Sequence, residues 1–184
     1  MNNAPAPDPL LLPVLGLHLE SALGPEGLAS ASYSPCLQYR FRLSRVWDET
    51  LPRAAFLLLN PSTATAFQLD PTLRRVYRYA RDWGMGSFEV VNIFAYRSTD
   101  PSVLYRVDDP VGAGNDEALL AAASVAEVVV AGWGTHGEYQ GRGRAVRELF
   151  ESAGRSLSVL RLTKHGHPGH PLYLPASLRP VPWW

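Results

Sequence analysis

Apolar runs and amphipathic segments alternate along most of the 184-residue chain. Residues 54–59 and 128–131 are continuously apolar and 88–94 nearly so, which is typical of strands covered on both faces. The segments between these runs place apolar residues three or four positions apart, the spacing of a helix with one buried face. The pattern predicts strands at 54–59, 88–94, 128–131 and 157–162, and helices at 71–83, 115–126 and 142–153.

The first of these helices has clear ends in the sequence. Asp70 is suited to cap its first turn, and Pro71 occupies the first helical position, where a missing N–H is tolerated. Gly84 ends it. Residues 95–114 are predicted to form a long loop, in which Asp100-Pro101 starts a short helix.

The order of elements predicts the fold class. Residues 38–47 alternate polar and apolar, which predicts a half-exposed strand paired with 54–59 as an antiparallel hairpin at a sheet edge. Strands that alternate with helices form a parallel sheet with right-handed crossovers. We therefore predict an α/β three-layer sandwich: a central four-stranded, mainly parallel sheet with an N-terminal antiparallel edge strand. Residues 1–36, which hold six prolines, are expected to form an irregular arm, and 37–184 a single α/β domain.

Charge narrows the function classes. The 17 basic and 17 acidic side chains cancel, which argues against a chain that coats nucleic acid through bulk charge. Three acidic and no basic residues precede Arg40, so the remainder carries a positive surplus and a local nucleic-acid face remains possible. Sixteen of the basic residues are arginines, which suit phosphate contacts.

Composition also bears on compartment and cofactors. No apolar run approaches the ~20 residues of a membrane span, and the N-terminus lacks the basic start of a secretory signal. We expect a cytoplasmic monomer with no membrane partner. A single cysteine, Cys36, cannot build an intramolecular disulfide or a four-cysteine zinc or iron–sulfur site, and no cofactor or metal is expected.

Polar, glycine and aromatic residues follow each predicted core strand. In open α/β sheets, ligands bind beyond the carboxyl ends of the strands. These segments are 60–63, 92–94, 132–137 and 164–171. Asn60 before Pro61 has two interpretations: its amide satisfies the local backbone at a turn, or it holds a water or substrate edge at the floor of a cleft.

Asn92 is a polar residue within a strand that should be buried. An unpaired buried amide costs on the order of 1–3 kcal/mol, so Asn92 must bond to neighbouring backbone or to a ligand. Its adjacent donor and acceptor match the edge of a nucleobase.

The remaining polar groups also allow alternatives. The histidines at 165, 167 and 170 are surface loop residues, metal ligands or an acid near a leaving group, and no carboxylate spacing favours the metal. The arginines of the first helix, together with Arg97 and Arg106 in the long loop, are a solvated face or a phosphate-binding surface.

Several of these segments resemble motifs of the uracil-DNA glycosylase superfamily. Residues 56–62 resemble its first motif, in which a strand runs into Asn-Pro or Asp-Pro, and 90–97 resemble its base-reading strand. Residues 167–172 resemble the His-Pro-Ser loop that inserts into DNA. The resemblance implies a uracil-DNA glycosylase-like fold without the iron–sulfur cluster of one branch. It also implies a water held by Asn60 and a leaving base stabilised by the loop histidine, for which we prefer His170 to His167.

A more specific resemblance is to an uncharacterised bacterial domain family. Its motifs are Leu-Asn-Pro-Ser-Thr-Ala, Val-Asn-Ile-Phe-Ala and His-Pro-Leu-Tyr-Leu-Pro, which stand here at 59–64, 91–95 and 170–175. This resemblance runs from about Tyr39 to Pro175 and implies the same fold and the same polar edge, but no particular reaction.

The favoured hypothesis is a DNA glycosylase-like enzyme that recognises a flipped, damaged or deaminated base and hydrolyses its N-glycosidic bond. Its catalytic residues would be Asn60 and His170, and its base-binding residues Asn92, Phe67 and Phe94. Its partner would be single- or double-stranded DNA, with candidate contacts at Ser62, Thr63, Arg74, Arg75, Arg78, Lys164 and His167. The alternative hypothesis is a non-catalytic nucleic-acid- or nucleotide-binding domain.

Overall fold

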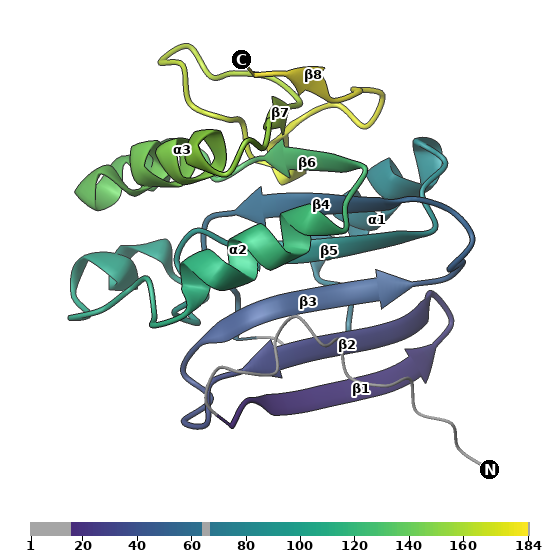
Figure 1. Ribbon diagram of the computed structural model, residues 1–184, viewed down its shortest axis with the longest axis horizontal. Coiled ribbons are helices and arrows are strands. Elements are labelled where there is room, and N and C mark those ends of the chain that lie inside the picture. Colours follow the sequence, from purple (N-terminus) through teal and green to yellow (C-terminus); the bar gives the residue numbers. More distant parts are fainter. Residues whose placement is uncertain (1–15, 64–66, 184) are drawn as a thin grey trace.

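The computed structural model describes residues 16–63 and 67–183, and within them the strands form one eight-stranded sheet in the order β1-β2-β3-β5-β4-β6-β7-β8 (Figure 1). The strands are β1 (His18–Gly24), β2 (Gly27–Tyr33), β3 (Arg40–Val46), β4 (Arg53–Leu58), β5 (Ser87–Asn92), β6 (Val128–Ala131), β7 (Ser158–Val159) and β8 (Val181–Pro182). The helices are α1 (Pro71–Asp82), α2 (Asn115–Ser124) and α3 (Arg142–Ser152), with the short 3-10 helices η2 (Pro101–Tyr105), η3 (Thr135–Gly141) and η4 (Pro171–Tyr173).

The predicted fold class is wrong. Only the neighbours β5-β4, β4-β6 and β6-β7 are parallel, whereas β1-β2, β2-β3, β3-β5 and β7-β8 are antiparallel. The described chain therefore forms one mixed sheet with antiparallel pairs in the majority, and not a four-stranded, mainly parallel sheet of uracil-DNA glycosylase-like layout. The predicted hairpin is also wrong, because β3 pairs with β2 and β5 and not with β4.

Two unexpected strands lie within the segment predicted to be an irregular arm. β1 and β2 form an antiparallel hairpin in which Gly24 pairs with Gly27 across Pro25-Glu26. Their Ala- and Ser-rich sequences have low strand propensity, so packing on β3 determines their structure. Gly27 has a φ of +99°, and a Cβ there would meet the Val46 carbonyl oxygen at 2.0 Å, so the turn requires glycine. The rest of that predicted arm, residues 1–15, lies outside the described residues.

The helices cover both faces of the sheet (Figure 1). α1 packs on one face through Leu73, Val76, Tyr79 and Ala80, while α2 and α3 pack on the other. Asp70 caps α1 with a hydrogen bond from the Leu73 N–H and Pro71 begins the helix, as predicted. Both helix α2 and helix α3 also lie where the spacing of apolar residues predicts them.

Strand β7 is much shorter than the predicted strand at 157–162. Its two residues pair with β6 on one side and with β8 on the other, where the Trp183 N–H donates to the Leu157 carbonyl. Among the described residues, none of the helices is both long and apolar enough to cross a membrane.

A β-bulge in β3 changes which face its first residue occupies. Ser32 pairs with Arg42 and Tyr33 pairs with Arg40, so Phe41 is an extra residue on β3. Regular alternation would place Arg40 and Arg42 on the same face, and an extra residue breaks that alternation. Phe41 consequently packs with Ala118 of α2, while Arg40 lies on the α1 face with Tyr33.

Candidate functional site

The ends of β4 and β5 meet the first turn of α1 and the loop that carries His170. Asn60 lies just after β4 and its side-chain Nδ2 donates to the carbonyl oxygens of Ser98 (2.8 Å) and Pro61 (3.2 Å). Its amide N–H groups therefore hold the neighbouring backbone, which corresponds to the first of the two interpretations given above. Its Oδ1 is the atom left to hold a water.

Asp70 connects this loop to α1. Its Oδ1 accepts from the Leu73 N–H at 2.7 Å, and its Oδ2 accepts from the Ser62 hydroxyl at 3.3 Å. The Asp70 carboxylate raises the pKa of both His170 and Arg40, so it lies close enough to act on each of them. The sequence identified Asp70 only as a helix cap.

His170 is held at this end of the sheet by the residue after it. A Cβ on Gly132, just beyond β6, would lie 2.8 Å from Pro171 Cδ and 3.3 Å from Leu58 Cδ2. Glycine at 132 therefore lets the His170 loop pack directly over the ends of β4 and β6.

The protonation state of His170 follows from its surroundings. Its Nδ1 accepts a hydrogen bond from the Leu172 N–H at 3.3 Å, so the proton of the neutral ring resides on Nε2. Burial lowers the pKa of His170 below its usual 6.5, although the Asp70 carboxylate opposes this shift. At neutral pH the ring is thus an uncharged hydrogen-bond donor through Nε2.

Asn92 is the last residue of β5 and is only 2% exposed. It pairs with Leu58 and shares its face with Phe88 and Val90, which is the face that α1 covers. Within the described part of the chain, no hydrogen-bond partner contacts its side-chain amide. Its backbone carbonyl is occupied, because it accepts from Nδ2 of Asn115 at 2.9 Å.

Arg40 was not anticipated from the sequence, whereas Arg97 was named with the helix arginines as a solvated or phosphate-binding residue. Arg40 is 4% exposed, and its Nε is sealed from solvent without a hydrogen-bond partner among the described residues. Arg97 lies with its guanidinium carbon 4.9 Å from the centre of the Tyr33 ring. Burial lowers the pKa of Arg40 to about 10, and the neighbouring cation of Arg97 adds to this effect. For Arg40, the only available signal was that it is the first basic residue of the chain.

The two predicted base-stacking residues, Phe67 and Phe94, lie in different surroundings. Phe94 is fully buried in the core on the α2 side, where its ring lies 6.1 Å from that of Tyr139. Its faces are therefore occupied by protein. Phe67 is 38% exposed and precedes α1, so its ring is accessible.

The predicted DNA contacts divide between two regions. Ser62 and Thr63 border the Asp70 site, and the Thr63 carbonyl accepts from Arg97 at 3.1 Å. The arginines of α1 lie on its outer side: Arg74 donates to the Leu69 carbonyl, Arg75 is half-buried and Arg78 lies 3.8 Å from Asp82.

Lys164 and His167 lie apart from this site. Lys164 is exposed on a turn closed by Thr163, and His167 Nδ1 lies 3.3 Å from Glu138. His167 lines a cavity of about 150 Å³ together with Trp133, Arg144 and Trp183. The other candidate loop histidine, His170, lies close enough to Asp70 for that carboxylate to raise the pKa of its ring.

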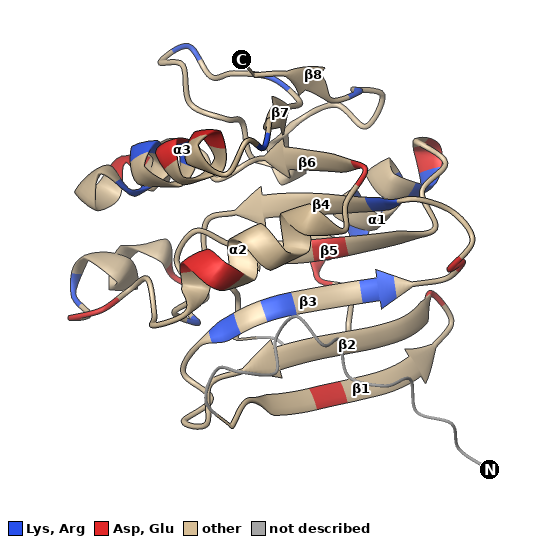
Figure 2. Cartoon of the chain, in the orientation of Figure 1, with Lys and Arg blue, Asp and Glu red and all other residues tan. Residues whose placement is uncertain are grey.

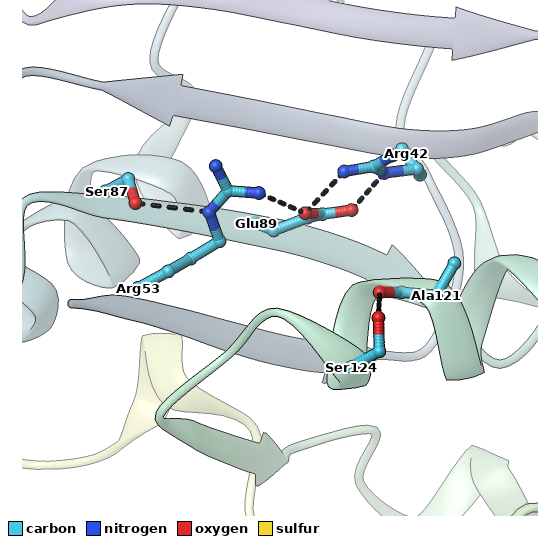
Figure 3. A network of polar contacts seen from close by, with 6 residues as sticks. All are labelled: Arg42, Arg53, Ser87, Glu89, Ala121 and Ser124. Carbon is cyan, nitrogen blue, oxygen red and sulfur yellow. Dashed lines mark hydrogen bonds and ion pairs between the residues drawn. The ribbon is translucent and has the colours of Figure 1, made fainter. Parts of the chain in front are cut away.

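A buried ion-pair network occupies the opposite face of β3 and β5 (Figure 3). Glu89 is fully buried and accepts two hydrogen bonds from Arg42, that from the terminal nitrogen at 2.7 Å. Arg53 lies 3.4 Å from the same carboxylate and donates to the Ser87 hydroxyl. Since every charge there has a partner, we interpret this network as structural.

In the described ranges, no group of three or more His, Cys, Asp or Glu side chains is placed to hold a metal ion. The polar groups gathered at the Asp70 site are instead an amide, a neutral imidazole, a carboxylate and two guanidinium groups. Such a set suits hydrogen bonding to a polar organic ligand that carries negative charge.

Comparison with known proteins gives a family but no activity. No curated protein and no solved structure matches the chain, so the resemblance to uracil-DNA glycosylases rests on the motifs alone. A family described as "Protein of unknown function (DUF1643)" matches residues 40–172. That range begins at Arg40, includes Asn60, Asp70 and Asn92, and extends just past His170. The chain belongs to the DUF1643 family.

Proposed function

We propose that this protein binds a nucleobase at the ends of β4 and β5 and hydrolyses its N-glycosidic bond. The single observation that carries the proposal is Asn92, a buried amide without a described partner, on the face that also holds Asp70. An amide with free donor and acceptor atoms matches a nucleobase edge, and a bound base would supply the hydrogen bonds that no described residue makes to it.

The proposed chemistry assigns one role to each polar group. Water adds to C1′ of the sugar while the bond from C1′ to the base nitrogen breaks, and the base leaves with the bonding electrons. His170 donates its Nε2 proton in a hydrogen bond that stabilises the departing anion. The Oδ1 of Asn60 orients the water, whose proton passes to solvent because an amide is not a base. A slow, dissociative reaction is the expected result.

The direct test is release of the base from DNA. Oligonucleotides that carry uracil, hypoxanthine, xanthine or a G·T mismatch are incubated with the purified protein, and abasic sites are detected by alkaline strand cleavage. We expect one of these substrates to be cut, and Asn92→Ala and His170→Gln to abolish cleavage. Glu151→Gln, an exposed change on α3, is the control that should keep it. Full activity in both site variants would contradict the assignment.

A matched pair of asparagines separates recognition from folding. The Nδ2 of Asn115 donates to the carbonyls of Asn92 and Ile93, so Asn115→Ala should reduce the free energy of unfolding. Asn92→Ala removes an amide without a described partner and should instead reduce affinity for the ligand. Equal losses of stability in the two variants would argue for a structural Asn92.

The second candidate function is binding without hydrolysis, and the geometry of Asn60 favours it. The Nδ2 of Asn60 donates to two backbone carbonyls, and an uncharged side chain cannot remove a proton from water. Under this alternative, the protein binds a ligand that contains a base but does not release the base from its sugar. Affinity for short DNA that falls steeply with salt would indicate DNA as partner, and salt-insensitive binding would indicate a free nucleoside.

A cytoplasmic location remains a prediction.

A further inference from the structure

Arg40 is a buried cation without a hydrogen-bond partner among the described residues. A buried charge is costly unless it is paired, and proteins normally retain one only with a partner or a ligand. Arg42, two positions along the same strand, satisfies this rule through Glu89, whereas the sealed Nε of Arg40 has no such acceptor. The three arginines of β3 are the blue segments of that strand in Figure 2.

Arg97 supplies a second cation that is already fixed in place. Its terminal nitrogens donate to the carbonyls of Leu37 (2.8 Å) and Thr63 (3.1 Å), and its guanidinium lies over the Tyr33 ring. The Nε of Arg97 is sealed from solvent and also has no partner within the described ranges. Two guanidinium groups therefore lie close to Tyr33, the residue that pairs with Arg40, and each has an Nε that no described residue accepts from.

The negative charge near these cations is insufficient to balance them. Among the described residues, the carboxylate with an electrostatic effect on Arg40 is Asp70. Both oxygens of Asp70 already accept hydrogen bonds, from Leu73 and Ser62, and it also faces His170. Arg40, which is 4% exposed, therefore lacks the direct carboxylate partner that Arg42 has in Glu89.

We propose that Arg40 and Arg97 bind a phosphate group, carried by a free mononucleotide or by the DNA backbone. Guanidinium groups match phosphate oxygens geometrically and form charge-assisted hydrogen bonds with them. The bulge at Phe41 creates the site, because it places Arg40 on the face of Asn92 and Asp70. The inference rests on the proposed function only for the molecule that carries the phosphate.

Isothermal titration calorimetry tests the site with inorganic phosphate, deoxyuridine, deoxyuridine 5′-monophosphate and a short oligonucleotide. We expect phosphate to bind the wild-type protein, and Arg40→Met to weaken binding by about tenfold to a hundredfold. Arg53→Met, which removes an arginine from the opposite face, is the matched control and should leave phosphate affinity unchanged. Stronger binding of the monophosphate identifies a free nucleotide as the source, and stronger binding of the oligonucleotide identifies the DNA backbone.

Two results would overturn the phosphate site. One is no phosphate binding by the wild-type protein, and the other is equal affinity in wild type and Arg40→Met. The failure of hydrolysis is a separate result. If phosphate binding depends on Arg40 but the protein releases no base, the proposed reaction is wrong and the phosphate site stands. If the Arg40→Met protein releases the base and binds phosphate as tightly as wild type, the proposed reaction stands and the phosphate site is wrong.

Discussion

Arg40 and Arg42 lie two positions apart on β3, and both are nearly sealed from solvent, yet their surroundings are opposite. Arg42 faces the fully buried Glu89 and binds both of its carboxylate oxygens. Arg40 faces Tyr33, a second cation and a carboxylate whose oxygens are already occupied. The extra residue at Phe41 produces this difference by reversing the face of one arginine.

The comparison shows how burial alone fails to identify a functional charge. A paired arginine such as Arg42 is part of the scaffold, because its charge is compensated within the protein. An unpaired one reduces stability in the free protein, and such a cost is typical of sites that a ligand completes. The two faces of one strand thus carry a structural network and a candidate binding site.

The largest expected effect comes from breaking the paired side. Arg42→Met leaves the Glu89 carboxylate buried, with Arg53 at 3.4 Å as its remaining described cation. We expect the free energy of unfolding to fall by about 3–5 kcal/mol, measured by urea denaturation. Adding Glu89→Gln removes the stranded charge and should recover part of the loss. A loss below about 1 kcal/mol would show that the network is not what stabilises this face.

Replacing Arg40 by Met should change the free energy of unfolding in the opposite direction. Burial lowers the pKa of Arg40 to about 10, a shift that corresponds to a cost on the order of 3 kcal/mol for keeping the side chain charged. Arg40→Met should therefore raise the free energy of unfolding of the ligand-free protein by about 1–3 kcal/mol. Urea denaturation in a phosphate-free buffer measures this gain. If Arg40→Met is less stable than wild type, Arg40 has a structural role like that of Arg42.

Substitutions of Asp70 can separate its effect on the pKa of His170 from its role as the cap of α1. Asp70→Ala removes the acceptor for the Leu73 N–H and should cost about 1 kcal/mol of stability. Asp70→Asn keeps a capping oxygen and should be nearly neutral, but it removes the charge that raises the pKa of His170. An NMR titration of the His170 ring should then give a lower pKa in Asp70→Asn than in wild type. An unchanged His170 pKa would contradict this link.

The smallest effect concerns His170 and pH. Burial depresses the pKa of His170 in the folded protein below 6.5, so the unfolded chain binds the proton more readily. The contribution of neutral His170 to stability is complete above about pH 6.5 and is lost as the pH falls through the folded-state pKa. The stability advantage of wild type over His170→Gln should therefore shrink on acidification, measured by urea denaturation at several pH values. An advantage that grows instead would reverse the sign of the shift.

Local patterns predicted the helices well and the sheet poorly. Asp70, Pro71 and the apolar spacing of α1 are short-range signals, and their effect is decided within one helix. The pairing partner of a strand is a long-range property, and nothing local to β3 indicates that it pairs with β5 rather than with β4. The segment of β1 and β2 was predicted to be an irregular arm, because its Ala and Ser residues have low strand propensity.

The sequence by itself determined the amphipathic helices, the apolar strands β4, β5 and β6, and Asn92 as a polar residue that burial would leave in need of a partner. These depend on hydrophobic periodicity and on the cost of an unpaired amide, which any compact fold imposes. Only the tertiary structure decided that Arg40 opposes Asp70 while Arg42 opposes Glu89. That outcome depends on one extra residue in β3, because a bulge shifts side chains between faces without changing the hydrophobic pattern enough to be seen.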